Sequence, residues 1–183
     1  MRLSWIAAVF LACLGAAHAQ KYRLADMKVS GNQRFPAAAV IAASALRAGQ
    51  LFTVKEVDAA KHRLADTGLF ASVDYRYDPK TVNRTTGYVL TWKVEEAFIS
   101  ATVRLDFPGI DEQQLWQELK KANALMDPKI PSNAFVVEYY RRNIETALRK
   151  RNRKEQVVSK NEGDLGTGQF FVIFRPANPP NPR

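Results

Sequence analysis

Apolar and polar positions follow a clear order between Thr53 and Tyr77. Thr53 with Glu56 three residues later is a capping box, in which each side chain pairs with a backbone N–H of the first helical turn. Apolar residues then recur every three or four positions, which is typical of one helix face. The residues of this face are Val54, Val57, Ala60 and Leu64. Gly68 can take the left-handed conformation that ends a helix, and apolar positions alternate after it, so the segment predicts a helix followed by a strand.

The same patterns place this pair of elements within a larger first unit. A strand is expected before it, then a helix that begins at a proline and is stopped by a glycine, and a hairpin is expected at its end. The expected elements are a strand at Tyr22–Val29, a helix at Pro36–Ala48 stopped by Gly49, the helix from Thr53, and strands Phe70–Tyr77 and Gly87–Val94 around the loop Asp78–Thr86. The predicted order is β-α-α-β-β.

A second unit with the same order follows. Its two helices begin at an aspartate cap, Asp111, and near Ser132, and the second is expected to turn an apolar face that includes Phe135 and Tyr140 inward. The expected elements are a strand at Ala101–Phe107, a helix from Asp111, a helix at Ser132–Arg151, and strands Gln156–Lys160 and Gln169–Arg175 across the loop Gly163–Gly168.

Repetition of one order of elements indicates a duplication. We therefore predict an α+β protein of two tandem β-α-α-β-β units, each a three-stranded mixed sheet covered by two helices. The predicted divisions are a unit at 20–96, a divergent unit at 97–176 and an unstructured tail at 177–183.

The N-terminus predicts export. Arg2 precedes an apolar run from Trp5 to Gly15, and Ala17-His18-Ala19 offers small residues for cleavage before Gln20. The run is shorter than the roughly 20 residues that span a bilayer, which disfavours the alternative of an anchor. Cys13 would leave with this signal peptide, residues 1–19. The mature chain would then contain no cysteine, which fits a bacterial periplasm better than an extracellular space rich in disulfides.

Charge points to acidic partners without choosing among them. The whole chain has a net charge of +9, and the part after residue 19 has 26 basic and 18 acidic residues, a net charge of +8. Nucleic acid is the least favoured partner outside the cytoplasm, which leaves anionic lipid or an acidic protein surface. The cations that could form such a basic surface are Arg141, Arg142, Arg149, Lys150, Arg151, Arg153 and Lys154.

The first unit resembles a POTRA domain, the polypeptide-transport-associated domain of outer-membrane assembly and two-partner secretion proteins. The family pattern is a strand ending in V-x-G-N, a G-x-x-F-T between the helices, an L-x-x-x-G-x-F-x-x-V into the second strand, and an acidic end to the third strand. The matching segments are Met27–Asn32, Ala48–Thr53, Leu64–Val73 and Val94–Glu96. The second unit resembles a divergent copy in which Asn152–Lys154 replaces the glycine-phenylalanine step.

The resemblance implies binding rather than catalysis. Domains of this family lie in the periplasm, receive extended polypeptide and dock accessory proteins, and an unpaired sheet edge can accept an added strand. In the family topology the second strand of each unit is the edge. The residues expected at these edges are Phe70, Ser72, Asp74, Arg76, Gln156 and Val158. Since no barrel follows, we expect an accessory that acts in trans on an outer-membrane barrel or on another envelope protein.

Other classes of function have less support in the sequence. After residue 19 there is one histidine, His62, and no cysteine, so the usual zinc sets and Cys-His pairs are excluded. Glu95 and Glu96 are adjacent in a strand and point to opposite faces. No enzyme, cofactor or metal is therefore expected. Two alternatives stay open: a binder of anionic lipid or lipopolysaccharide, and a scaffold for cell division or the envelope.

Overall fold

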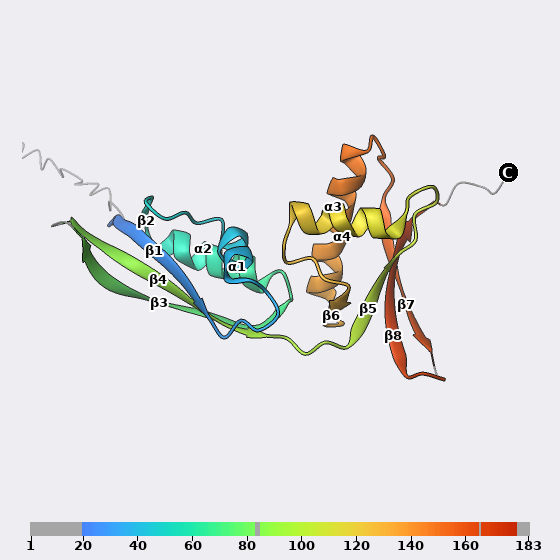
Figure 1. The fold of residues 1–183 in the computed structure, drawn as a ribbon, viewed down its shortest axis with the longest axis horizontal. Coiled ribbons are helices and arrows are strands. Elements are labelled where there is room, and N and C mark those ends of the chain that lie inside the picture. Colours follow the sequence, from blue (N-terminus) through green and yellow to red (C-terminus); the bar gives the residue numbers. More distant parts are fainter. Residues whose placement is uncertain (1–19, 83–84, 165, 179–183) are drawn as a thin grey trace, which may run out of the picture.

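The computed structural model describes residues 20–82, 85–164 and 166–178. Two α+β units follow one another along the chain, and in each the two long helices lie on one side of a sheet (Figure 1). The first contains β1 (Tyr22–Ser30), α1 (Ala37–Ser44), β2 (Leu51–Phe52), α2 (Val54–Ala65), β3 (Phe70–Val82) and β4 (Thr85–Glu96). The second contains β5 (Ala101–Leu105), α3 (Glu112–Ala122), β6 (Lys129–Ile130), α4 (Ala134–Lys150), β7 (Val157–Asp164) and β8 (Gln169–Pro176).

The tandem α+β fold with mixed sheets is confirmed. The strand orders are β2-β1-β4-β3 and β6-β5-β8-β7, with β1 parallel to β4 and β5 parallel to β8. Each sheet has one more strand than predicted, because a two-residue strand between the helices pairs with the first strand. The predicted signal peptide lies outside the described residues, as does the predicted tail from residue 179 onward.

The capping box of α2 is confirmed. Thr53 N–H donates to Glu56 Oε2 at 2.6 Å, and Glu56 N–H donates to Thr53 Oγ1 at 3.3 Å. Val57, Ala60 and Leu64 are fully buried, whereas Val54 in the first turn is 39% exposed. Local sequence therefore predicts where this helix begins and which face it buries.

The prediction that α1 runs to Ala48 and is stopped by Gly49 is wrong. The helix ends at Ser44, and Ala45 takes the left-handed conformation with a φ of 58°. Arg63 on α2 donates two hydrogen bonds to the Ser44 carbonyl, at 3.1 and 2.6 Å, and Leu46 turns into the core. A contact between two helices thus ends α1 earlier than its own sequence indicates.

The first hairpin is longer than predicted. Strands β3 and β4 stay paired from Phe70 with Glu96 to Val82 with Thr85, so the expected loop Asp78–Thr86 is mostly strand. Pro79 lies within β3 opposite Tyr88. Proline lacks an N–H, and a strand tolerates it where that position faces away from the partner strand.

The second unit corrects one prediction and explains another. Phe135 was expected to be buried but is 63% exposed, whereas Val136, the next residue in the first turn of α4, is fully buried, so the buried face of the helix begins at Val136. Asn152, at the end of α4, has a φ of 60°. Asparagine tolerates this conformation better than most residues, so it replaces the glycine of the first unit at the helix end.

A compact joint connects the units. Asn133 caps α4 through its Oδ1, which accepts from Val136 N–H at 2.9 Å, and its Nδ2 donates to the Gly68 carbonyl at 3.0 Å. Arg34 donates to the Lys129 carbonyl at 2.8 Å. The start of the second helix of one unit therefore contacts the end of the second helix of the other.

Glu96 holds the first-unit side of this joint in place. Its Oε1 accepts three backbone hydrogen bonds, from Gln33, Arg34 and Phe35, at 2.8, 2.9 and 3.1 Å. Its other oxygen lies 3.5 Å from Arg34 Nε. The acidic end of the third strand, a part of the family pattern, is thus a structural carboxylate that orders the turn after β1.

Candidate functional site

The candidate binding edges are β3 and β7. Each is the last strand of its sheet order and pairs with one neighbour, while the opposite edge of each sheet is a strand of two residues. Strand β3 has 13 residues and β7 has 8. The long unpaired edge of each sheet is therefore the strand that the family topology indicates.

The predicted residues of β3 have different environments. Phe70 is buried and packs edge-on against Phe35, with ring centroids 5.8 Å apart, so its side chain is not at the surface. Ser72, Asp74 and Arg76 are exposed. Because Val73 between them is buried, their side chains lie on the sheet face away from the helices.

Asp74 covers part of the β3 edge. Its Oδ1 accepts the backbone N–H of Tyr75 at 2.9 Å and the Lys61 ammonium at 3.2 Å. These hydrogen bonds, the backbone one first, lower the pKa of Asp74, so the carboxylate stays ionised near neutral pH. Successive N–H groups of an edge strand alternate between its partner and the free side. The Tyr75 N–H, bonded to a side chain, is therefore a free-side group that Asp74 occupies.

An aromatic row beside β3 was not recognised from the sequence as a surface feature. Tyr75 lies 6.3 Å from Tyr77, and Tyr77 lies 5.8 Å from Tyr88, measured between ring centroids. Tyr77 is 41% exposed. Tyr75 donates to Asp58 on α2 at 2.8 Å, and burial, followed by this bond, raises the pKa of Tyr75 to about 12. The alternation of tyrosines in this segment was the available signal.

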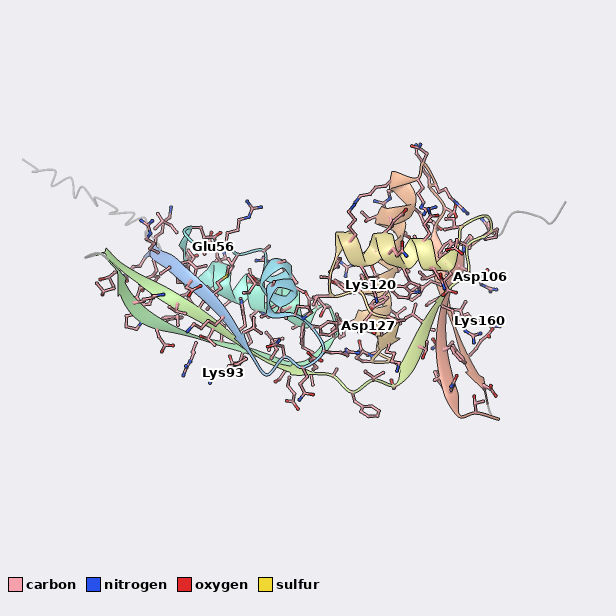
Figure 2. The ribbon with its side chains drawn as sticks, in the orientation of Figure 1. Glu56, Lys93, Asp106, Lys120, Asp127 and Lys160 are labelled. Carbon is pink, nitrogen blue, oxygen red and sulfur yellow. The ribbon has the colours of Figure 1, made fainter. Side chains whose placement is uncertain are left out.

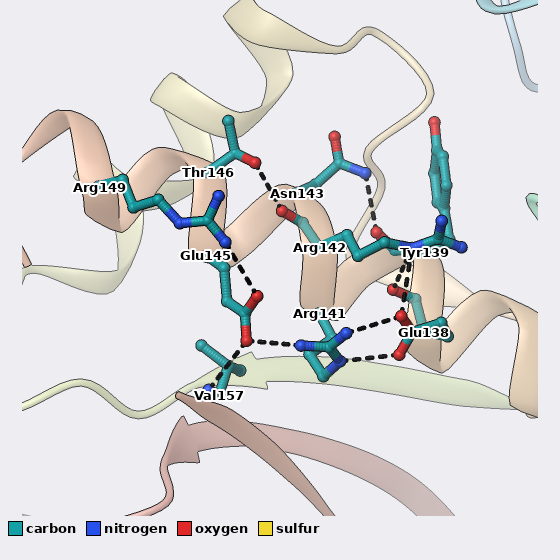
Figure 3. Close-up of polar contacts among 9 residues, drawn as sticks. All are labelled: Glu138, Tyr139, Arg141, Arg142, Asn143, Glu145, Thr146, Arg149 and Val157. Atoms are coloured by element: carbon teal, nitrogen blue, oxygen red, sulfur yellow. Dashed lines mark hydrogen bonds and ion pairs between the residues drawn. The ribbon is translucent and has the colours of Figure 1, made fainter. Parts of the chain in front are cut away.

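The predicted β7 residues lie along a groove beside α4. Gln156 immediately precedes the strand and Val158 is 38% exposed. The groove has a volume of about 500 Å³, and its walls include Glu145 and Arg149 from α4. Glu145 Oε1 accepts the N–H of Val157 at 3.3 Å (Figure 3). The first edge amide of β7 is thus already bonded to α4.

Most of the predicted basic surface is neutralised by carboxylates. Arg141 bridges Glu138 and Glu145, with N–O distances of 2.7 and 2.6 Å, and Arg149 also reaches Glu145 (Figure 3). The remaining ion pairs are Arg142 with Glu138, Arg151 with Glu118, and Arg153 with Glu155. Among the described residues, no ion pair involves Lys150 or Lys154. Five of the seven predicted cations are therefore held in local ion pairs with carboxylates.

The described residues also bear on other kinds of site. In the part of the chain that the structure describes, no three His, Cys, Asp or Glu side chains gather so that they could hold a metal ion. Within residues 20–82, 85–164 and 166–178, no helix is long and apolar enough to cross a membrane. A cleft of about 540 Å³ lies at the joint, with walls that include Ala42 and Arg63 of the first unit and Ala124 and Tyr139 of the second.

Comparisons with known proteins place the first unit in a family. The POTRA model, described as surface antigen variable number repeat, matches residues 22–97. No curated protein matches the chain.

Three solved structures have low identity to this chain. The N-terminal domain of Omp85 from the thermophilic cyanobacterium Thermosynechococcus elongatus is 18% identical, with a TM-score of 0.40, over 85% of this chain and 63% of that one. POTRA1-3 of the periplasmic domain of Omp85 from Anabaena is 13% identical, with a TM-score of 0.39, over 85% and 62%. POTRA3-5 of BamA from Haemophilus influenzae is 14% identical, with a TM-score of 0.40, over 88% and 68%.

The chain thus spans less than two thirds of the first two of these structures. The family match and the repeated order of elements agree with each other. Residues 22–97 of this chain therefore form a POTRA domain, and a second unit with the same order of helices and strands follows it.

Proposed function

We propose that this protein is a non-enzymatic binding module of the bacterial periplasm that receives extended polypeptide by strand addition at the β3 edge. The process it serves is outer-membrane protein assembly or secretion, and its partners are an outer-membrane barrel or accessory envelope protein and the client polypeptide. The observation that carries the proposal is the position of β3, a 13-residue strand paired on one side, within the POTRA domain. Unpaired N–H and C=O groups on such an edge accept a strand of almost any sequence.

Of the two edges, β3 is the stronger candidate. It is longer than β7, and the groove beside β7 is spanned by Glu145, which bonds the Val157 N–H. Strand addition at β7 would have to break that bond, which Arg141 and Arg149 support by holding Glu145 in place. We therefore assign β7 a secondary role.

The β3 edge is guarded at two positions. Asp74 covers the N–H of Tyr75, and Pro79 has no N–H to offer. Natural proteins use such features to limit indiscriminate pairing of an edge. An incoming strand must displace the Asp74 carboxylate from Tyr75, so Asp74 sets how readily the edge accepts a partner.

Replacing Asp74 provides the test. Asp74→Ala frees the Tyr75 N–H and is expected to strengthen binding of a fluorescent extended peptide severalfold in an anisotropy titration. Asp78→Ala is the matched control, because Asp78 lies on the same strand and pairs with Arg76. It is expected to leave the affinity unchanged. Equal affinities for wild type and both variants would contradict the role of the β3 edge.

Cross-linking in intact envelopes tests the partner class. A photoreactive residue at Ser72 on β3 is expected to capture an envelope protein or its client, whereas the same residue at Lys93 on the central strand β4 is expected to capture much less. Capture of lipid alone, or of nothing, at Ser72 would favour the alternative function.

The alternative is an anionic-lipid or lipopolysaccharide binder that uses the basic surface. The carboxylates that pair with five of its seven cations weaken this interpretation. Charge reversal at Arg149 and Arg151 is expected to leave peptide binding intact. Salt-sensitive binding to anionic vesicles that this reversal abolishes would support the lipid function instead.

A further inference from the structure

The two sheets differ sharply on the face that turns away from the helices. The register aligns them, since Phe70 pairs with Glu96 at the start of β3 and Val157 pairs with Pro176 at the start of β7. Counting back from these pairs, Thr91 and Lys93 of β4 correspond to Phe171 and Ile173 of β8. The first sheet is therefore polar at the centre of this face, and the second is apolar there.

The neighbouring positions of the second sheet extend this difference. We call the β8 face the set Thr102, Arg104, Val158, Lys160, Glu162, Phe171, Ile173 and Arg175, which the strand registers bring together. The guanidinium carbon of Arg104 lies 3.9 Å from the centre of the Phe171 ring, and Val158 is 38% exposed. Figure 2 shows Lys160 on this side of its sheet, away from the helices, and Lys93 on the corresponding face of the first sheet.

The β8 face has an apolar centre and a cationic rim. Three cations surround one carboxylate, Glu162, which pairs with Lys160 at 2.8 Å, so the net charge is +2. The corresponding first-unit positions on β1, β3 and β4 are Lys28, Ser30, Ser72, Asp74, Arg76, Thr91, Lys93 and Glu95. They hold three cations, two carboxylates and three hydroxyls, with no apolar side chain. The same fold therefore does not require apolar residues on this face.

We propose that the β8 face is a docking surface for an acidic amphipathic helix of a partner protein. A sheet commonly buries an apolar face against helices, and the other face of this sheet is already covered in this way. Leucine or phenylalanine on the helix would cover Phe171 and Ile173, and flanking carboxylates would reach Arg104 and Arg175. This surface is the face of the sheet and not the row of unpaired backbone groups along its edge, and it does not depend on the function proposed for the β3 edge.

The charge arrangement favours a polypeptide over a membrane. Surfaces that recognise anionic lipids have clusters of about 4–8 lysines and arginines. Here Lys160 is engaged by Glu162, whose pKa is lowered chiefly by the bond from Lys160, so the carboxylate remains charged within the rim. A dense layer of lipid phosphates would be repelled by the Glu162 carboxylate. A helix, in contrast, can place its own carboxylates only beside Arg104 and Arg175.

A helical probe separates this proposal from strand addition. The probe is a stapled peptide with leucines on one face and glutamates beside them; its backbone groups are bonded internally, so it cannot add a strand. Titrated into the isotope-labelled chain 20–183, it is expected to shift the amide signals of β5 and β8. The double variant Phe171→Thr with Ile173→Lys, which installs the residues of the first sheet, is expected to bind about tenfold more weakly, as loss of a central apolar contact does.

Two further variants complete the test. Arg104→Ser with Arg175→Ser retains the apolar centre and is expected to lose selectivity for the acidic probe over a lysine-substituted one. Lys93→Glu on the first sheet is expected to bind as wild type does. Equal affinity for the two probes, shifts confined to β3, or binding only to vesicles of phosphatidylglycerol would each overturn the proposal. Thermal unfolding of each variant confirms that it is folded.

Discussion

Substituting Gly68 by alanine tests whether the two units are held in one arrangement. Gly68 has a φ of +68°, so alanine at this position bears a cost of about 1–2 kcal/mol for the left-handed conformation. An added Cβ would also lie 2.5 Å from Asn133 Oδ1 and 2.6 Å from the Val136 backbone N. Both of these atoms belong to the second unit, so the substitution acts on the joint as well as on the backbone.

The expected magnitude follows from two ways of relieving this overlap. If the units stay together, overpacking costs about 1–3 kcal/mol. If they part, the bonds from Asn133 to Gly68 and from Arg34 to Lys129 are lost, at about 0.5–1.5 kcal/mol each. Gly68→Ala should therefore lower the free energy of unfolding by about 2–5 kcal/mol.

Gly49→Ala is the matched control. Gly49 has a φ of +89°, and a Cβ added there would meet nothing within 4 Å, so its substitution bears the conformational cost alone, about 1–2 kcal/mol. Urea unfolding of the chain 20–183 measures both losses. Because this part of the chain has no cysteine, spin labels on cysteines introduced at Lys55 and Lys120 can report the distance between the units.

We expect Gly68→Ala to broaden the label distance distribution and Gly49→Ala to leave it as in wild type. Equal losses of stability in the two variants, together with unchanged distances, would refute the reasoning. The contact between Gly68 and the start of α4 would then play no part in fixing the arrangement of the units.

Three smaller predictions follow from single side chains. Asn133→Asp retains the helix-capping oxygen but removes the donor to Gly68, so it should broaden the same distance distribution with little loss of unfolding free energy; an unchanged distribution would contradict this. Hydrogen bonds from Thr53 lower the pKa of Glu56, so the stabilisation is complete above the ordinary pKa of 4.5 and is lost as pH falls through the lowered folded-state value. Glu56→Gln should therefore lose less unfolding free energy than wild type between pH 5 and 3. If the unfolding free energies of the two proteins fell in parallel over this range, the role of the Thr53–Glu56 capping box would be contradicted. Asn152→Gly should raise the unfolding free energy by about 0.5–1 kcal/mol because it relieves a φ of 60°, and a lower melting temperature would disprove this.

Local sequence predicted the elements whose signals lie within a few residues. The capping box at Thr53, the aspartate cap at Asp111 and the left-handed Gly68 all lie where the sequence indicates. Each depends on contacts between residues up to about four positions apart, which a short window contains in full. The family resemblance also comes from such segments, taken in order.

Distant contacts explain the errors. The end of α1 depends on Arg63, 19 residues after the Ser44 carbonyl that it bonds. The pairing of Arg151 with Glu118 spans 33 residues, so the sequence showed a run of cations without this partner. In contrast, the spacing of Glu145 and Arg149 on α4 is a pattern that helix periodicity could have revealed.

The sequence by itself determined the tandem α+β order, the helix starts and the relation to POTRA domains, because these depend on periodicity and on short-range capping. Only the tertiary structure decided that Asp74 covers an edge amide, that Asn133 joins the units at Gly68, and that Phe171 and Ile173 face away from the helices beside Arg104. Which side of β3 is left unpaired, the bond from Asn133 to Gly68 and the contact of Arg104 with Phe171 all depend on elements far apart in sequence. Strand register and side-chain direction at such places are set by packing of the whole chain.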